Sequence, residues 1–401
     1  MSNTLTTLTE DVTLAVWARA IGPSELQAML SAASRPGIIS FALGLPAPEL
    51  FPRDALLRAA ASVLADDMRS LQYGPPSSLL KRQIVGLMEQ RGVACHERQV
   101  FLTAGAQQGM NLLARLLLEP GGEVLVEEMI YPGFQQVIEP YRPNLLTVRT
   151  DSATGMGISA VESILGRGLR PAFIYAMSCG HNPLSVSLSL WKRKRLAELA
   201  REYRIPIIED DAYGFLYYAE SSVPPIKAFD DQWVYYVGSF SKTLAPGMRT
   251  GWIVAPEALI SKLSIVKEAS DIDTTTFSQR TIAAFLEMED FNAHLAALRL
   301  EYRKRRDTML HSLRDNFPPE AQWKVPGTGV FIWVELPGEV NAAALLKSAI
   351  EEERVAFIPG GAFSVNRNHQ GASCLRLNFS NSSPDLIEEG IKRLSRAISR
   401  L

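Results

Sequence analysis

An alternation of helix-like and strand-like segments after Phe101 most constrains how this chain can fold. Apolar residues at helical spacing over residues 111–118 are separated by two glycines from a short valine-rich run over residues 123–127. Another buried strand pattern, over residues 173–177, precedes a helical pattern over residues 190–203. This order predicts βαβ units, and therefore an α/β fold with a mostly parallel sheet flanked by helices. Ligands are expected at the carboxyl ends of its strands.

The length of 401 residues exceeds what one hydrophobic core usually serves, so a large domain and a smaller one are expected. From about residue 287 the pattern changes to a long charged helix followed by shorter strand and helix patterns. The predicted division is an N-terminal segment packing on the small domain at residues 1–45, a large domain at residues 46–286, and a smaller α+β domain at residues 287–401. This division leaves room for a cleft between two domains.

Composition and charge exclude several classes of protein. A formal net charge of -2 gives no field that would attract nucleic acid or an anionic membrane, and no apolar run reaches the roughly 18 residues of a membrane helix. The N-terminus lacks the pattern of a signal peptide, and three distant cysteines do not form a disulfide framework, so a cytoplasmic protein is expected. The five histidines lack metal-ligand spacing, and no metal site is predicted.

The strongest chemical signal is a Ser-Phe-Ser-Lys sequence at residues 239–242, between two apolar strand patterns. Burial lowers the pKa of a lysine such as Lys242, and a partly neutral amine can form an imine with an aldehyde cofactor. The hydroxyls of Ser239 and Ser241 and the guanidinium of Arg249 would supply hydrogen-bond donors and positive charge for a phosphate. An isolated lysine is more often a solvated surface residue, so the prediction depends on the whole pattern.

With the Arg-x-Gly-Trp sequence at residues 249–252, this motif resembles that of the fold-type I aminotransferases of class I/II, which depend on pyridoxal 5'-phosphate (PLP). The 2-aminoadipate and broad-specificity members are the most similar, and the resemblance extends from residues 35–41 to residues 376–379. It implies the PLP fold of type I, with the cofactor bound by residues 46–286. It also implies that Lys242 is the Schiff-base anchor of PLP and carries the proton between the substrate Cα and the cofactor C4'.

An acidic stretch, Glu209-Asp210-Asp211, ends a predicted strand. A carboxylate that faces the pyridine nitrogen keeps it protonated, so that the ring can accept electrons from a Cα carbanion. Asp210 is the preferred residue, because the resemblance places a tyrosine three residues later, here Tyr213, to hydrogen-bond the phenolic oxygen of the cofactor. Asp211 is the competing residue, and two solvated acids in a turn are the alternative without a cofactor role.

Other cofactor contacts are expected around a turn that follows one strand and opens a helix. Gly105, Ala106 and Gln107 lie there, where small residues and free helix N–H groups let the backbone approach a phosphate. The resemblance implies that the ring of Tyr131 stacks on the cofactor, although an ordinary core aromatic is the alternative. It also implies that Tyr73 reaches the phosphate of the neighbouring subunit, which predicts a homodimer with shared active sites.

The substrate is expected to bind through Arg376, which alternates with apolar residues in a predicted strand. A guanidinium that points inward there suits bidentate capture of an α-carboxylate, and the alternative is an edge-strand arginine facing water. The family uses its matching arginine in this way. The resemblance also implies that the backbone of Gly44 touches the carboxylate and that Asn182 donates to the phenolic oxygen of the cofactor, beside the substrate.

Residues 178–185 depart from the family pattern. The family usually has Asn-Pro-Thr-Gly after Pro-x-x-Gln, whereas this chain has Ser-Cys-Gly-His-Asn-Pro-Leu-Ser. His181 is either an additional acid or base or a plain hydrogen-bonding residue of a turn. In some relatives an arginine binds a distal carboxylate, but residues 21–25 of this chain contain none, so a dicarboxylic substrate is less expected, with Arg19 close enough to keep the question open.

These features together predict an aminotransferase that moves an α-amino group between a small amino acid and a 2-oxo acid. The altered loop leaves a second hypothesis, a PLP enzyme of specialised metabolism that uses the same stabilised carbanion for β/γ-elimination, replacement or C–C bond formation. PLP-binding transcriptional regulators also resemble the chain. However, only about forty residues precede Gly44, which is too few for an added DNA-binding domain.

Overall fold

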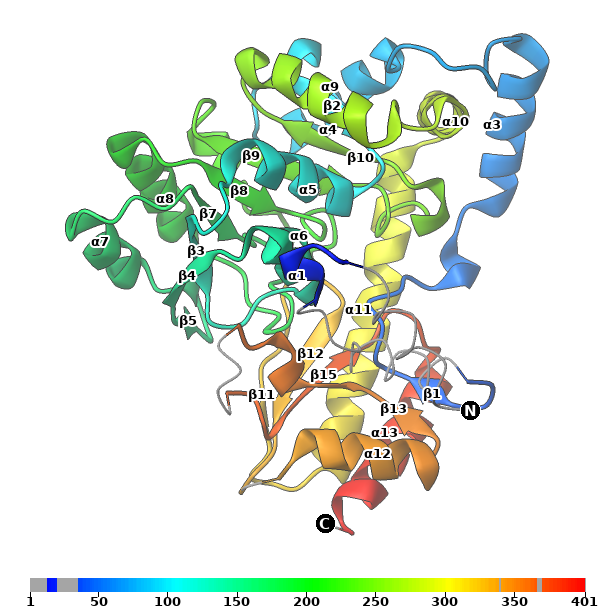
Figure 1. Cartoon of the computed structure of the whole chain (residues 1–401). Coiled ribbons are helices and arrows are strands. Elements are labelled where there is room, and N and C mark those ends of the chain that lie inside the picture. The colour runs from blue at the N-terminus through cyan, green and yellow to red at the C-terminus, as the bar shows by residue number, and fades with distance from the viewer. Residues whose placement is uncertain (1–12, 20–34, 339, 366–369, 401) are drawn as a thin grey trace.

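The computed structural model of the protein describes residues 13–19, 35–338, 340–365 and 370–400. Its largest element is a seven-stranded sheet (Figure 1). In sheet order the strands are β2 (Val100–Thr103), β10 (Gly251–Val254), β9 (Val234–Ser239), β8 (Ile207–Asp210), β7 (Phe173–Ala176), β3 (Glu123–Glu127) and β4 (Asn144–Val148). All neighbouring pairs are parallel except those of β10, so the predicted mostly parallel sheet is confirmed.

The antiparallel strand β10 follows from the length of its connection. Only residues 240–250 separate β9 from β10, and this connection is too short to hold the helix that usually joins two parallel strands. The chain therefore turns back along β9, and Gly251 pairs with Ser239 on one side and with Thr103 on the other. As a result the loop that contains Lys242 is fixed at both ends by central strands.

Helices cover both faces of this sheet because its strands are apolar on both sides. Successive residues of one strand enter different cores: Val124 and Val126 pack with α5 (Ala106–Leu117) and α6 (Pro132–Ile138), whereas Leu125 packs with α7 (Ile158–Gly166) and α8 (Leu190–Tyr203). The edge at β2 and β10 is covered by a third core. Its helices include α3 (Arg53–Asp66), α4 (Ser78–Gln90) and α10 (Thr276–Met288), and α9 (Glu257–Asp271) packs beside α5.

A second, antiparallel sheet lies at the other end of the molecule (Figure 1). Its strands are β11 (Gln322–Trp323), β12 (Phe331–Glu335), β15 (Cys374–Asn378) and β14 (Ile358–Pro359). The 26-residue helix α11 (Phe291–Asn316) runs from the large sheet to this smaller one, where α12 (Ala342–Glu351) and α13 (Pro384–Ile398) also pack. The strand β1 (Ile39–Ser40) pairs with β13 (Val355–Ala356), so this part of the N-terminal segment lies against the small sheet.

The other described elements are short. They are α1 (Val16–Arg19), β5 (Thr150–Asp151), β6 (Gly155–Met156) and the 3-10 helices η1 (Pro48–Leu50), η2 (Glu97–Gln99), η3 (Glu139–Tyr141), η4 (Ile226–Phe229), η5 (Pro246–Met248) and η6 (Gly360–Phe363). Among the helices of the described residues, none has both the length and the apolar character needed to span a bilayer.

Candidate active site

A cavity of about 550 Å³ lies between the ends of the large-sheet strands and the small sheet. Strands β8 and β9 and helix α5 end or begin at this cavity, and β15 reaches it from the small sheet. All but two of the residues expected at the site line it: Gly44, Ala106, Gln107, Tyr131, Asn182, Asp210, Tyr213, Ser239, Ser241, Lys242, Arg249 and Arg376. The fold therefore gathers side chains that lie more than 300 positions apart in the sequence.

The two remaining expected residues are Gly105 and Tyr73. Gly105 caps the N-terminus of α5 with φ 88°, and a Cβ at this position would lie 2.9 Å from the guanidinium of Arg249. It therefore borders the cavity from behind Arg249, and the close approach requires a glycine. Tyr73 is 78% exposed and does not line the cavity of its own chain.

Lys242 is half-buried in the loop between β9 and β10, and its Nζ donates a hydrogen bond of 2.6 Å to the carbonyl of Gly44. Burial, together with the positive charges of Arg376 and Arg249, lowers the pKa of the ammonium group to about 8. A lysine with this pKa is a neutral amine in a substantial fraction of molecules near neutral pH. Its side chain can therefore act as a nucleophile or a base within the cavity.

Asp210 is the last residue of β8 and is 3% exposed. The hydroxyl of Tyr175, on the neighbouring strand β7, donates to Oδ2 at 2.9 Å, but Oδ1 has no hydrogen-bond partner among the described residues. Burial raises the pKa of Asp210 to about 6, although the bond from Tyr175 opposes this rise. An unpaired carboxylate oxygen that borders a cavity is a site for a cationic or N–H donor.

Asp211, the competing acid, points away from the cavity. Its Oδ2 is 2.9 Å from Nη2 of Arg91 and accepts a hydrogen bond of 3.1 Å from the hydroxyl of Tyr236. The preceding acid, Glu209, accepts from the backbone N–H groups of residues 226 and 227. Of the three acids in this stretch, the structure thus brings only Asp210 to the cavity.

The opposite end of the cavity is rich in donors suited to an anion. The 12-residue helix α5 begins there, and because its cap Gly105 has no side chain, none of the described side chains caps the first N–H groups of the helix. The hydroxyls of Ser239 and Ser241 lie 2.9 Å apart, and Arg249 is fixed by a bond to the carbonyl of Ala104. Helix terminus, hydroxyls and guanidinium form a donor set for a phosphate.

Two tyrosine rings border the space between these ends. Tyr131 caps the N-terminus of α6, and a Cβ at Gly133 would collide with its ring, so a glycine lets the ring turn into the cavity. The buried ring of Tyr213 packs edge-on against Phe331, with centroids 5.9 Å apart. Burial raises the pKa of both hydroxyls, which therefore remain protonated donors at neutral pH.

Arg376 extends from β15 into the cavity and is 6% exposed. Its Nη1 donates to Oδ1 of Asn182 at 2.7 Å, Nη2 donates to the carbonyl of Ala42, and Nε has no partner among the described residues. Within the described part of the chain no carboxylate pairs with it, and burial lowers its pKa to about 10. A buried cation with only neutral partners favours the binding of an anion from outside.

Sequence reasoning missed the aromatic residues that support these charged groups. Tyr175 bonds to Asp210 and is itself stacked on Phe134, with centroids 3.7 Å apart. Phe331 and Phe363 flank Arg376, whose guanidinium carbon lies 4.1 Å and 4.9 Å from the two ring centroids. Their positions in apolar strands and turns carry no signal that separates them from ordinary core residues.

The N-terminal residues weighed for a distal carboxylate divide into two groups. Residues 21–25 lie outside the described residues. Arg19 is described: it ends α1, bonds to the carbonyl of Leu14 and does not line the cavity. Among the described residues no group of His, Cys, Asp or Glu side chains is arranged to hold a metal ion.

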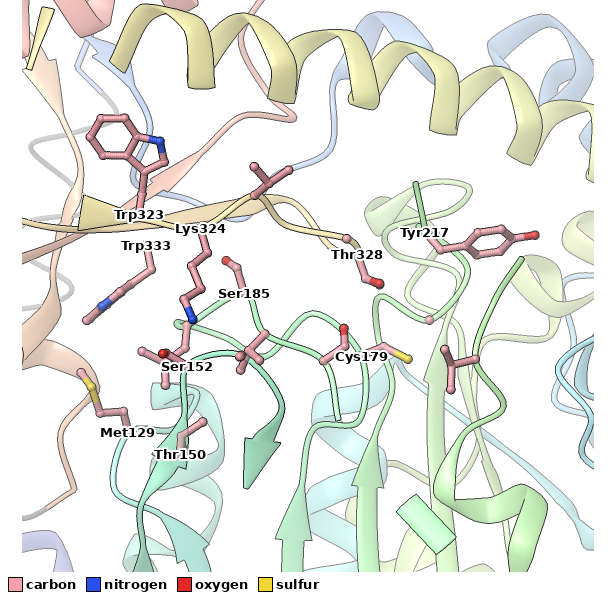
Figure 2. Close-up of a pocket in the computed structure, with 18 of the residues that line it drawn as sticks. Met129, Thr150, Ser152, Cys179, Ser185, Tyr217, Trp323, Lys324, Thr328 and Trp333 are labelled. Carbon is pink, nitrogen blue, oxygen red and sulfur yellow. The ribbon is translucent and has the colours of Figure 1, made fainter. Parts of the chain in front are cut away.

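A second, larger cavity of about 940 Å³, here called the rear groove, lies on the other side of residues 178–187. Figure 2 shows Trp323, Lys324 and Trp333 on its small-sheet side, and Thr150 and Ser152 on the side of the large sheet. Cys179 and Ser185 from the intervening segment also line it (Figure 2). None of the residues expected at the site lines the rear groove.

Comparison with known proteins agrees with this geometry. A family model described as "Aminotransferase class I and II" matches residues 43–394. The chain is 36% identical to 2-aminoadipate transaminase of Thermus thermophilus, covering 96% of this chain and 98% of that protein. It is 34% identical to aromatic-amino-acid aminotransferase 1 of Thermococcus litoralis, and this match covers 94% of this chain and 91% of that protein. A crystal structure of alpha-aminoadipate aminotransferase from Thermus thermophilus is known in complex with N-(5'-phosphopyridoxyl)-L-leucine. It superposes on this protein with a TM-score of 0.89 at 34% sequence identity. The superposition covers 96% of this chain and 97% of the Thermus chain.

Proposed function

The chain belongs to the class I and II aminotransferases, which are PLP-dependent transferases, and from this premise we propose how its residues divide the work. PLP, when bound, supplies an aldehyde that condenses with amines and a ring that accepts the electron pair left at the substrate Cα. The two relatives described above are aminotransferases by name, so elimination, replacement or C–C bond formation is not favoured. The reaction is the transfer of an α-amino group between an amino acid and a 2-oxo acid.

The observation that carries the proposal is that Oδ1 of Asp210 has no hydrogen-bond partner among the described residues. A buried carboxylate oxygen without a donor fits the ring nitrogen of PLP, which would keep its proton there. At the other end, Ser239, Ser241, Arg249 and the start of α5 at Gly105, Ala106 and Gln107 would hold the phosphate. The residues present therefore fit the cofactor at both ends.

The space between these ends is assigned to the face and the phenolic oxygen of the cofactor. Tyr131 would lie on one face of the ring, with Ala212 on the other. The hydroxyl of Tyr213 and the amide of Asn182 would donate to the phenolic oxygen, because both groups border the cavity and the amide oxygen of Asn182 is already used by Arg376. These contacts would orient the ring before any substrate arrives.

Lys242 is proposed as the group that holds PLP and then moves the proton. Its lowered pKa gives it both a nucleophilic amine for the aldehyde and a base for the hydrogen on the substrate Cα. The carbonyl of Gly44, which accepts from Nζ, limits where the amine can reach. Lys242 would thus move one proton between the substrate Cα and the cofactor C4' without a second catalytic residue.

Arg376 and Asn182 are proposed to bind the substrate carboxylate, with Gly44 beside them. The guanidinium is buried, has neutral partners and retains a free Nε, so an α-carboxylate would complete its charge pairing. Once PLP occupies Lys242, Asp210 and Arg249, no charged group among the described lining residues remains for a substrate side chain. We therefore infer that the preferred amino acids have uncharged side chains.

We also propose a cytoplasmic homodimer. A row of exposed apolar side chains follows α3 and the turn after it: Leu57, Leu64, Met68, Leu71 and Tyr73. Such a row favours burial against another copy of the chain, and it would bring Tyr73 of the partner subunit to the phosphate. Size-exclusion chromatography with light scattering tests this point, and a monomer at micromolar concentration would contradict it.

A panel of amino acids mixed with the purified holoenzyme tests the function directly. We expect the visible absorbance of the bound cofactor to fall as the amino group moves onto it, and mass spectrometry should find the matching 2-oxo acid. Donors with uncharged side chains should react at least about tenfold faster than glutamate or 2-aminoadipate. Loss of a β or γ substituent in place of a 2-oxo acid would contradict transamination, and a preference for acidic donors would contradict only the side-chain inference.

A further inference from the structure

The segment 178–187 forms the wall between the active-site cavity and the rear groove. Asn182 faces the active-site cavity, whereas Cys179 and Ser185 line the rear groove, as Figure 2 shows for the latter two. His181 lines neither cavity. Its side chain is 2% exposed, inside the wall, which excludes direct contact with a substrate and leaves a role through its neighbours.

The ring of His181 is held from two directions. The backbone N–H of Leu184 donates to Nδ1 at 3.4 Å, so Nδ1 carries a lone pair and the ring proton is assigned to Nε2. Nε2 lies 3.1 Å from Oε2 of Glu127, the last residue of β3, but the ring N–H is not aligned with that oxygen for a hydrogen bond, so the contact is electrostatic. Glu127 is 3% exposed, and its other oxygen accepts a hydrogen bond of 2.6 Å from the hydroxyl of Thr150. The histidine thus places the wall in polar contact with a buried carboxylate at the end of a large-sheet strand.

The turn that follows His181 carries this attachment to the substrate-binding groups. The backbone of His181 bonds to Val186 at 2.8 Å and accepts from Ser185 at 2.6 Å, which closes a turn around Asn182. The side chain of Asn182 then accepts from Arg376 at 2.7 Å. A continuous set of contacts therefore runs from β3 to the guanidinium on β15.

We propose that His181, held by Glu127, is a positioning residue for substrate carboxylate binding: it fixes the turn that aims Asn182 at Arg376. This inference rests on the proposed role of Asn182 and Arg376. A displacement of Asn182 would weaken capture of the carboxylate that every substrate carries.

Steady-state kinetics of His181→Leu and His181→Gln, compared with the parent holoenzyme, test the proposal. Leucine fills similar space without a donor, and we expect it to raise KM for both the amino acid and the 2-oxo acid about tenfold while kcat changes less than about threefold. Glutamine should restore KM to within about threefold of the parent, because its amide can reach Glu127. Removal of the partner in Glu127→Ala should raise KM as His181→Leu does, and the double variant should be no worse than either single variant.

His311→Leu is the matched control, because His311 pairs with Asp315 on the exposed face of α11 and lines neither cavity. It should leave both constants unchanged. If His181→Leu lowers only the melting temperature, or if His181→Gln raises KM as much as leucine does, the proposal is wrong. If the leucine variant does not fold, the glutamine and Glu127→Ala variants decide by the same criteria. Arg376→Leu tests the proposed carboxylate site separately from the positioning role of His181. An unchanged KM in this variant would refute the carboxylate site itself, whatever the His181 variants show.

Discussion

The active-site cavity and the rear groove share a wall but differ in how their buried charges are satisfied. Around the rear groove the buried Arg193 donates from all three guanidinium nitrogens to the carbonyls of residues 178, 188, 223 and 224. Arg91 forms an ion pair with Asp211, although Nε of Arg91 and Oδ1 of Asp211 have no hydrogen-bond partner among the described residues. Around the active-site cavity Oδ1 of Asp210 and Nε of Arg376 have no hydrogen-bond partner among the described residues, and Lys242 has a lowered pKa. The rear groove is nevertheless the larger of the two.

Volume alone therefore does not identify a ligand site in this protein. A buried charge without its partner destabilises the fold, so a structure that retains several in one cavity indicates that a ligand supplies the missing partners. An ion pair such as Arg91 with Asp211, or a guanidinium whose nitrogens all donate, as in Arg193, is in contrast explained by folding alone. Substitutions around the two cavities can test whether the chemistry follows the unpaired charges or the larger space.

The largest effect is expected for Lys242→Ala. This substitution removes both the attachment of PLP and the proton carrier, so activity should fall by about 10³- to 10⁴-fold in steady-state assays. Borohydride treatment should label position 242 of the parent and leave the variant unlabelled. Lys324→Ala, which removes a lysine of the rear groove, is the matched control and should retain parental activity. Equal losses of activity in both variants would contradict the assignment of the chemistry to the active-site cavity.

A large loss of stability is expected for Asp211→Asn. Arg91 is 2% exposed and would keep its charge without the carboxylate 2.9 Å away, which costs about 3–5 kcal/mol of unfolding free energy. Urea denaturation of the apoprotein measures this effect. An unchanged midpoint would mean that the pair beside the rear groove contributes no more to folding than a solvated one.

The neighbouring substitution Asp210→Asn should act in the opposite direction on the apoprotein. Because burial raises the pKa of Asp210 from 3.8 to about 6, the ionised group disfavours folding above pH 6, and this cost disappears as the pH falls toward 3.8. At pH 7 the variant should therefore be more stable by about 1–3 kcal/mol, and the gain should shrink between pH 6 and pH 4.

The same variant should lose transaminase activity by about 10²-fold, because a neutral amide no longer holds the proton on the ring nitrogen. Denaturation at several pH values and kinetics at one pH measure the two effects on one protein. A destabilised apoprotein, or full activity, would contradict the assignment of Asp210 as a functional rather than a structural charge.

The smallest effect is expected when the rear groove is filled. Ser152→Trp introduces a bulky ring beside Lys324 and Thr150, and kcat and KM should change less than about twofold. A larger change at unaltered melting temperature would show that the rear groove takes part in the reaction, and the contrast between the two cavities would then fail.

The sequence predicted most about the site and the fold where a motif is consistent with only one structural or chemical role. Lys242 with its two serines and Arg249 lies at the cavity as expected, and the mostly parallel sheet follows from the alternation of patterns. The choice between Asp210 and Asp211 could be stated but not settled by the sequence, because it depends on which side of the β8 terminus faces Arg91, a residue 120 positions away. The role of Tyr73 needs a second chain, and the division at residues 46 and 287 stays a prediction.

The supporting residues were beyond sequence reasoning for a different reason. Tyr175 and Glu127 are ordinary members of buried strands, and only the register of β7 and β3 places one beside Asp210 and the other beside His181. A single chain gives the apolar periodicity of a strand but not its neighbours in the sheet. The contribution of both residues depends on hydrogen-bond partners that only the three-dimensional arrangement of the strands brings close.

The pairing of Gly251 with both Ser239 and Thr103 has a consequence for how this enzyme can change. It locks the lysine loop and the phosphate turn to one another across three strands, and a Cβ at Gly251 would lie 2.9 Å from the backbone of Gly105. Insertions or deletions in either loop would disrupt the pairing of β10 with β2 and β9. Evolution or engineering of a new specificity therefore has to change residues outside these two loops. The small sheet is not part of this junction, so its residues other than Arg376 and the aromatic rings that flank it are better placed for such change.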